Sequence, residues 1–496
     1  MQIHHKTNFN DGFAFKGERI MKNVCKLLVL VLILSIFAGC AEAPEEFDIN
    51  FASQGDGVAD LDGIELLYRI NLDSGNGGIG LSDNYLGYVL ETEFSDLAMK
   101  RVKDLEEKYN FKLKMTTETA DLVNMTAGGM KFSDIFLSPS FNYFSWCKTG
   151  LLTGISRLSD YIDYRDSEKW GSPQILESMF YKDDVYGLTP NAWPEQNYTS
   201  FGYPLVANVD LIMTNGAQNP RELVEAKTWT WDIFNTELDK NTIVEGSEVK
   251  SYGLVTSYPY FASMILLSNG AKFADVNADG ELICGYYTDA GFRALEEIRE
   301  VWYGAYKHTV SREEVYLSET VTSNFVNEMG TYAFLPTHFI FGVYGEVAMK
   351  LDNFAILPTP TGPDVDPDHV MSYHHTMYYA ISFPITSDNV DAAALVVNEI
   401  YEPLPGYETK DDIKEYMSRN YFFDERDADA FFDLFENSYY NYDYTTGFKN
   451  REIPSQICTT EKAISELLEE QSTVVESCFT DYVEPTMEAY DVLFGE

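Results

Sequence analysis

From about residue 61 onward, the chain alternates short apolar runs with amphipathic segments. Residues 63–70 (GIELLYRI) and 134–137 (DIFL) are apolar runs of strand length. Between them, apolar side chains recur at helical spacing with charges interspersed: Phe94, Ala98, Val102, Leu105 and Tyr109. Strand-sized runs that alternate with helices are typical of α/β layers. We therefore predict an α/β fold, with the first helix closing at Asn110 and with SPSFNYF as a loop after the second strand.

The second half of the chain continues this pattern. Its amphipathic stretches predict helices at residues 391–402, 411–418, 427–437 and 460–482. Residues 275–283 (DVNADGELI) superficially resemble a calcium loop, but the twelfth position is Tyr286, which cannot supply a bidentate carboxylate. An Asp-Gly hairpin turn is the better interpretation of this segment.

The N-terminal region contains an export signal. Residues 21–40 read MKNVCKLLVLVLILSIFAGC, with two lysines before an apolar run that is too short to span an ~30 Å hydrocarbon layer comfortably. The ending FAGC resembles a bacterial lipobox, which implies a lipid on Cys40. The alternative, an ordinary signal peptide, would need an A-x-A-like cleavage site, and none is present. We interpret residues 1–39 as the signal region, with the true start at Met21, and residues 40–60 as the lipidated cysteine and a flexible acidic tether.

Composition narrows the possible partners. Of 496 residues, 45% are apolar and 15% aromatic, enough to bury a large core in at least two lobes. The 79 acidic residues outnumber the 35 basic ones, for a net charge of −44. Such a surface repels nucleic-acid phosphates and anionic headgroups. We therefore expect no nucleic-acid partner, and a membrane attachment only through the lipid.

Four cysteines remain after Cys25 and Cys40: Cys147, Cys284, Cys458 and Cys478. No C-x-x-C spacing occurs, which argues against a zinc site or a redox motif. Four thiols allow three disulfide pairings, but a core of this size needs no crosslinks, so buried free thiols are expected. We expect neither a cofactor nor a resident metal.

A series of segments resembles one known family. In order, they are KRVKDLEEKYN (100–110), FSDIFLSPSF (132–141), YGLTPNAW (186–193), LVANVDLI (205–212), TWTWDIF (228–234), LLSNGAKF (266–273), FVNEMGTYAFLPT (325–337), FAILPTPTGP (354–363) and YAISFPITSDNVDAAALVVNEI (379–400). Together with the lipobox, this order resembles the maltose-binding-type extracellular solute-binding proteins of bacterial ABC importers.

The resemblance implies a two-lobed, periplasmic-binding-protein-like type II fold with hinge crossovers and a ligand cleft. Lobe one is expected at 61–187 and 328–370, and lobe two at 205–327 and 380–496, with crossovers at 188–204 and 371–379. The implied function is to capture a small solute, a mono- or oligosaccharide, by cleft closure and to deliver it to ABC importer permease subunits. The protein would be a monomeric, extracytoplasmic lipoprotein on the cell membrane, and not an enzyme.

Candidate ligand-binding residues combine aromatic rings with hydrogen-bonding groups, as sugar sites require. From four places in the chain they are Ser138, Ser140, Phe141 and Asn142; Asn191, Trp193 and Glu195; Tyr258 and Tyr260; and Thr337, His338, Tyr373 and His374. Pro259 is expected to hold its segment extended, which would point both flanking tyrosines the same way.

Two alternatives stay open. The same fold could bind a peptide, a polyamine or a metal, and the acidic charge would steer cations toward it. Two histidines, His374 and His375, are adjacent, but in an extended strand they face opposite sides and cannot chelate one ion together. A secreted glycan-active enzyme is the alternative of another class, yet no G-x-S-x-G, H-E-x-x-H or P-loop motif is present.

Overall fold

The computed structural model describes residues 59–70, 84–170, 176, 179–182, 184–191, 203–311, 318–341, 345–373, 379–439 and 452–488. The signal region, Cys40 and most of the tether lie outside this part of the chain, as do Trp193, Glu195 and His374. Within the described residues, no helix is both long and apolar enough to cross a membrane.

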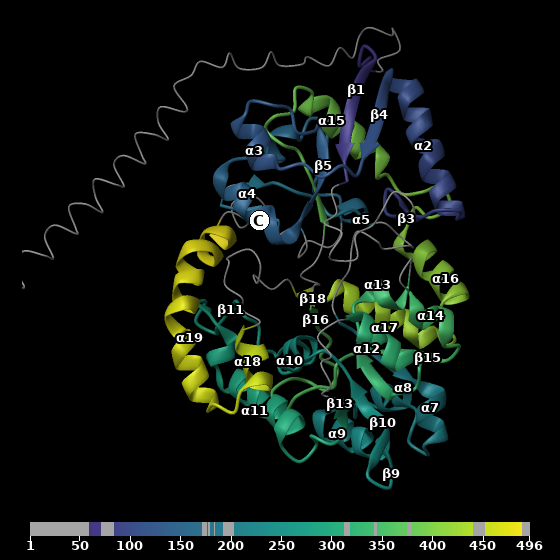
Figure 1. Cartoon of the computed structure of the whole chain (residues 1–496), viewed down its shortest axis with the longest axis vertical. Coiled ribbons are helices and arrows are strands. Elements are labelled where there is room, and N and C mark those ends of the chain that lie inside the picture. The colour runs from purple at the N-terminus through teal and green to yellow at the C-terminus, as the bar shows by residue number, and fades with distance from the viewer. Residues whose placement is uncertain are drawn as a thin grey trace, which may run out of the picture. The chain divides into compact units, whose positions relative to one another are not determined.

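The first sheet has four strands in the order β17-β5-β1-β4 (Figure 1). They are β17 (Tyr379–Ser382), β5 (Ile135–Pro139), β1 (Ile64–Arg69) and β4 (Phe111–Thr116). Strand β1 runs parallel to β4 and β5, whereas β17 is antiparallel to β5. Helix α2 (Glu93–Tyr109) buries the predicted apolar stripe and ends at Asn110, whose left-handed conformation (φ 52°) closes it as expected.

The second sheet has its main strands in the order β13-β10-β14-β8-β15, with β9 paired to β10. Their bounds are β13 (Val310–Ser311), β10 (Glu248–Val255), β14 (Gly330–Phe334), β8 (Leu205–Asn208), β15 (Phe354–Leu357) and β9 (Ile243–Glu245). Successive residues of a strand point to opposite faces, and both faces of this sheet are buried. Val206 and Ile356 belong to one apolar cluster, while their neighbours Leu205 and Leu357 belong to another.

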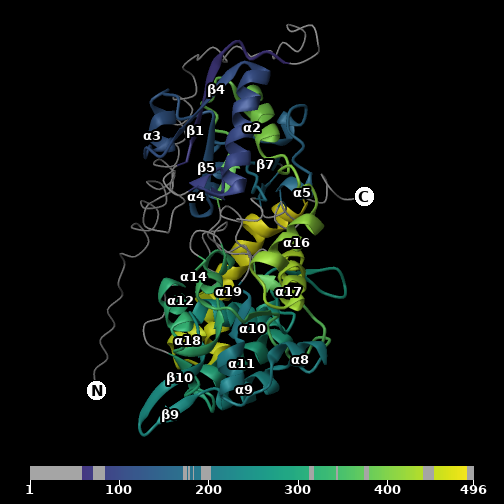
Figure 2. The same cartoon turned by 90° about the vertical axis from the view of Figure 1, so that its right-hand side faces the viewer.

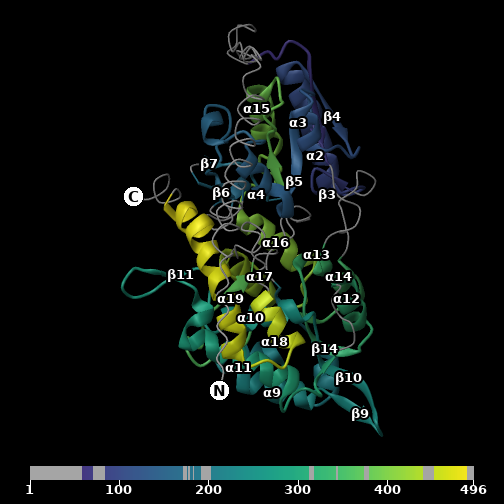
Figure 3. The same ribbon diagram turned by 60° about the vertical axis from the view of Figure 1, so that its left-hand side comes forward.

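Helices cover both faces of the second sheet. One cluster includes α9 (Trp231–Lys240), α10 (Tyr258–Leu267), α11 (Asp289–Tyr303), α18 (Glu452–Thr459) and α19 (Ile464–Cys478), and Figure 3 shows α18 beside α10 and α11. The other includes α12 (Ser318–Val326), α13 (Thr337–Ile340), α14 (Glu346–Lys350), α16 (Lys410–Asn420) and α17 (Glu425–Glu436). Helices α16 and α17 pack side by side (Figure 2).

The other described elements are short, apart from two longer helices. They are β2 (Asn84–Tyr85), β3 (Tyr88–Val89), α3 (Leu122–Ala127), α4 (Ser140–Thr149), η1 (Ser156–Leu158), α5 (Ser167–Trp170), β6 (Phe180–Tyr181), β7 (Asp184–Val185), α7 (Val209–Thr214), α8 (Pro220–Glu225), β11 (Asp275–Val276), β12 (Leu282–Ile283), η2 (Gly285–Tyr287), β16 (Ser372–Tyr373), α15 (Val390–Ile400), β18 (Ser438–Tyr439) and η3 (Phe479–Val483). Strands β11 and β12 form the predicted hairpin, with Gly280 at φ +81° in its turn.

The predicted division of the chain is wrong in its second half. Residues 328–370 were assigned to lobe one, but they carry β14 and β15, which pair with β8 in the second sheet. Residues 380–400 were assigned to lobe two, but β17 pairs with β5 in the first sheet, and α15 packs on α2. Short apolar runs such as 330–334 and 379–382 look alike in sequence. The sheet that each run joins depends on strands far away in the chain, so the runs themselves do not reveal it.

The chain also passes between the two sheets at residues 401–409, a connection that the sequence did not indicate. This segment leads from α15, on the first-sheet side, to α16, which packs against α17. On the first-sheet side, the Tyr401 hydroxyl hydrogen-bonds the Tyr68 hydroxyl at 3.0 Å, and Lys169 forms an ion pair with Glu402. The start of the connection is therefore fixed to the first sheet.

The cysteines are free in the described structure, as predicted. Three of them, Cys147, Cys458 and Cys478, are buried, and Cys284 is half-buried. Burial raises the pKa of Cys284 to about 12.

Candidate functional site

Several candidate residues meet at one edge of the second sheet. Strands β10 and β14 run parallel, so their carboxyl ends lie together, and the antiparallel β8 begins at the same edge. Tyr258 and Tyr260 follow β10, and Thr337 and His338 follow β14. Tyr203 lies two residues before the first residue of β8, Leu205. The carboxyl edge of a sheet in an α/β fold is where ligands usually bind.

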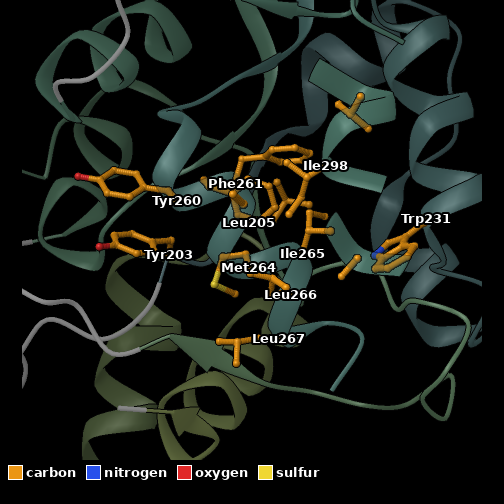
Figure 4. Packing of buried hydrophobic residues seen from close by; sticks show 14 of the residues in the cluster. Tyr203, Leu205, Trp231, Tyr260, Phe261, Met264, Ile265, Leu266, Leu267 and Ile298 are labelled. Carbon is orange, nitrogen blue, oxygen red and sulfur yellow. The ribbon is translucent and has the colours of Figure 1, made fainter. Parts of the chain in front are cut away.

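Tyr203 and Tyr260 form a stacked aromatic pair at this edge. Their ring centroids are 3.9 Å apart and their planes are inclined by 15°. Figure 4 shows both hydroxyls pointing the same way, away from the apolar side chains of Leu205 and Phe261. Sequence reasoning missed Tyr203; the available signal was an aromatic residue and a proline directly before the buried run LVAN.

The segment around Pro259 is helical, so the predicted extended conformation is wrong. Helix α10 begins at Tyr258, with Ser257 as the preceding cap residue and Pro259 in the first turn. Proline suits that position, because its missing N–H would have no partner there and its fixed φ fits a helix. The two tyrosines consequently contact different neighbours: Tyr258 lies edge-on to Trp302, with ring centroids 6.3 Å apart, whereas Tyr260 stacks on Tyr203.

Thr337 and His338 begin the short helix α13 after Pro336. Thr337 is buried, and the half-buried His338 ring lies 4.4 Å from the Phe339 ring, measured between centroids. Burial lowers the pKa of His338 to about 4, so the imidazole is neutral at neutral pH. A neutral imidazole has one donor and one acceptor nitrogen, which suits it to polar, uncharged ligands.

The candidates on the first-sheet side lie in strand β5 and at the start of helix α4. The Ser138 hydroxyl is buried and joins β5 to β17, through a 3.1 Å hydrogen bond to the Ala380 carbonyl and a 2.9 Å contact with the Ser382 hydroxyl. The predicted SPSFNYF loop is wrong from Ser140 onward, because α4 begins there, and Asn142 is half-buried on it. Ser140 and Phe141 are described in their backbone only.

Asn191 follows the point where the chain leaves the first sheet. Its Nδ2 donates to the carbonyls of Ser167 (3.1 Å) and Glu168 (3.2 Å), and its buried Oδ1 accepts no hydrogen bond from the described residues. The side chain lines a narrow pocket of about 20 Å³ together with Tyr401 and Tyr407. Asn191 therefore links the first crossover to the 401–409 connection.

The last candidates, Tyr373 and His374, belong to the segment before β17. Tyr373 is described in its backbone, as part of β16, which pairs with β18. Among the described residues, no group of three histidine, cysteine, aspartate or glutamate side chains is arranged to hold a metal ion. His374 and His375 lie outside those residues.

The chain was compared with known proteins. No protein-family model matches the sequence, and a search of the curated proteins finds no match. Solved structures match over most of the chain. The GacH receptor of Streptomyces glaucescens, solved unliganded and with acarbose, is 13% identical, with a TM-score of 0.53 over 85% of this chain and 99% of its own.

Two further structures give the same result. An ABC substrate-binding protein from Listeria monocytogenes, in complex with cycloalternan, is 14% identical, with a TM-score of 0.56 over 84% of this chain and 100% of its own. An ABC transporter solute-binding protein from Thermotoga lettingae, bound with α-D-tagatose, is 14% identical, with a TM-score of 0.54 over 84% of this chain and 100% of its own. At these identities the likeness shows the fold, and it confirms the predicted periplasmic-binding-protein-like architecture.

Proposed function

We propose that this chain, which has the α/β fold of the periplasmic sugar-binding proteins, is an extracellular lipoprotein that captures a mono- or oligosaccharide for an ABC importer. The observation that carries the proposal is the extent of the likeness. It takes in 84% or more of this chain and nearly the whole of sugar-binding receptors in three separate comparisons. Little of the chain is left for an added catalytic domain, which favours a binding protein over a glycan-active enzyme.

The chemistry of the second sheet's edge supports a sugar as the ligand. A sugar presents apolar C–H faces and a rim of hydroxyls, so it binds best to rigid aromatic surfaces with uncharged polar groups nearby. The stacked rings of Tyr203 and Tyr260, both buried in this structure, would form the aromatic wall of the site, and the neutral His338 would supply a donor and an acceptor. Asn142 is proposed to complete the site from the first-sheet side, and Trp193, Glu195, Tyr373 and His374 are proposed as further ligand contacts.

Cleft closure would couple binding to delivery. The connections expected at 188–204 and 371–379, together with the one at 401–409, would join the elements of the two sheets, since residues up to Tyr373 still pair with second-sheet elements. A ligand that contacts both sides stabilises the closed arrangement over the open one, which is a population shift. The importer permease would then recognise the closed form.

Membrane attachment is proposed through Cys40 alone. A random-coil segment as long as residues 41–60 would reach on the order of 25 Å, which would keep the protein close to a membrane partner. When cells are given labelled fatty acid, the label should be attached to the full chain and not to the Cys40→Ser variant. Equal labelling of both chains would contradict the anchor.

The function is tested by thermal unfolding of the chain from residue 41, with and without candidate ligands. A ligand that binds only the folded state raises the unfolding midpoint by mass action. We expect a shift with one class of glycan that is lost in Trp193→Ala and kept in Trp229→Phe, a change at a core residue that precedes α9 and is not among the candidates. Shifts only with peptides, polyamines or divalent metals would overturn the sugar assignment, and product formed from a glycan would indicate an enzyme.

A further inference from the structure

A cavity of about 280 Å³ lies apart from the candidate site, between α8, β15 and α17. Figure 1 shows where these three elements lie. Its walls are mainly apolar, formed by Val224, Ile356, Leu357, Pro358, Val370 and Ala430. None of its lining residues belongs to the candidate solute site. The volume is close to the lower end of the range for pockets that hold small molecules.

Buried ion pairs fix the walls of this cavity. Arg221 at the start of α8 donates to both Asp427 oxygens on α17, from Nε at 3.0 Å and from Nη2 at 2.7 Å. Its remaining contacts are the Asn353 side chain (3.1 Å) and the Phe354 carbonyl (2.8 Å). Both members of the pair are almost fully buried, so α8 and α17 are held at a defined separation.

The second arginine that lines the cavity, Arg426, is also bound to carboxylates. Arg426 donates to the two oxygens of Asp424, at 2.9 and 2.7 Å, and to Glu225 at 3.0 Å. Because both arginines are already bound to carboxylates, neither offers a vacant partner for an anionic ligand. The cavity is therefore unsuited to phosphates, sulfates and carboxylates.

The other charged side chains that α17 contributes to the cavity lining are carboxylates. Asp429 and Asp433 stand one turn apart on α17 and both line the cavity. Asp429 is paired with Lys414, whereas Asp433 forms no ion pair within the part of the chain that the structure describes. Partial burial and then the charge of Asp429 raise the pKa of Asp433, an exposed residue, while the charge of Lys414 opposes this shift and that of Glu436 adds to it. A cation at Asp433 would relieve this repulsion.

We propose that this cavity is a second binding site, for a small amphipathic primary amine. The apolar body of the amine lies among the six apolar side chains, and its ammonium group forms an ion pair with Asp433. The match rests on the shape and apolar lining of the cavity, together with the excess of carboxylates at its rim. The proposal does not depend on the sugar-binding function, because the two sites share no residue.

The probe is 2-phenylethylamine, titrated into the chain from residue 41 by calorimetry. For a ligand of nine non-hydrogen atoms we expect a Kd on the order of 1 mM. The matched probes 2-phenylethanol and 3-phenylpropanoate keep the apolar body and replace the ammonium by a neutral and an anionic group. Both should bind at least about tenfold more weakly, because only the amine can pair with Asp433.

Three variants locate the binding. Asp433→Asn removes the carboxylate, and Ala430→Leu fills the cavity, so each should weaken amine binding at least about tenfold. The control Glu425→Gln removes an exposed carboxylate of the same helix that does not line the cavity, and it should change Kd less than about twofold. If Ala430→Leu does not fold, Val224→Phe fills the cavity from the opposite helix.

Equal binding of amine and alcohol would overturn the proposal. So would an equal loss in Glu425→Gln and Asp433→Asn, or undetectable amine binding. Displacement of the amine by a saturating sugar would also overturn it, because the amine would then occupy the solute site. Absence of sugar binding would instead count against the proposed function and leave the amine titration unaffected.

Discussion

The rings of Tyr203 and Tyr260 stack with their centroids 3.9 Å apart. Tyr203 precedes the second-sheet strand β8, and Tyr260 lies in the first turn of α10, so the contact ties the entry into that sheet to the helix after β10. It places two stacked and buried aromatic rings at the edge where the ends of β10 and β14 meet. These rings are the best-defined part of the proposed solute site.

The aromatic pair should also contribute to folding stability. Tyr260 is 8% exposed, and Tyr260→Leu should lower the free energy of unfolding by about 2 kcal/mol, because it removes both the ring stack and buried area. Tyr260→Phe keeps the ring and should cost less than about 1 kcal/mol. Urea unfolding measures both values. Equal losses in the two variants would show that the hydroxyl, and not the stacked ring, carries the stability.

The buried Arg221–Asp427 pair should show strong coupling. Arg221→Met leaves the Asp427 carboxylate buried without its cation and should cost about 3–5 kcal/mol. Adding Asp427→Asn removes the uncompensated charge and keeps an acceptor for the Ile356 amide, so the double variant should recover at least about 1 kcal/mol. A double-mutant cycle by urea unfolding tests this. Strictly additive losses would contradict the coupling.

Stability should depend on pH through His338. Its folded-state pKa is depressed to about 4, whereas the unfolded chain binds the same proton near pH 6.5. Between these values the unfolded state binds more protons, so the free energy of unfolding rises with pH, by about 1 kcal/mol per pH unit at its steepest. His338→Gln should flatten the curve between pH 4 and 6.5. An unchanged slope in this variant would show that His338 is not responsible.

The free thiols should be protected until the protein unfolds. Burial raises the pKa of Cys284 to about 12 and raises those of Cys147 and Cys458 further, so almost no thiolate exists at pH 8. A thiol reagent should therefore modify the native chain from residue 41 at least about 100-fold more slowly than the urea-unfolded chain. Four thiols should react after unfolding, and detection of only two would reveal a disulfide.

Local structure was largely predictable from the sequence. The α2 stripe of Phe94, Ala98, Val102 and Leu105 follows from helical periodicity, and the β11–β12 hairpin follows from an Asp-Gly turn. Both depend on residues close together in the chain. Pro259 was misread because proline suits an extended segment and the first turn of a helix equally well, and the sequence around it does not separate the two.

Strand partnership was not predictable in the same way. The run at 330–334 and the run at 379–382 are both short and apolar, yet one pairs with β8 and β10 and the other with β5. Pairing depends on tertiary packing and on register with distant strands, and even β10 lies more than 70 residues before β14. Hydrophobic periodicity does not encode this information. For the same reason the sequence did not indicate Tyr203, because its role depends on a contact with Tyr260 in a distant helix.

The central claim is sugar capture, and equilibrium titration tests it most directly. The chain from residue 41 should be titrated by calorimetry with linear and cyclic oligosaccharides and with monosaccharides, alongside Tyr260→Leu and Trp193→Ala. The account predicts saturable binding of at least one of these sugars by the parent chain, and at least tenfold weaker binding by both variants. Binding of a peptide, a polyamine or a metal, together with no heat of binding from any sugar, would contradict it.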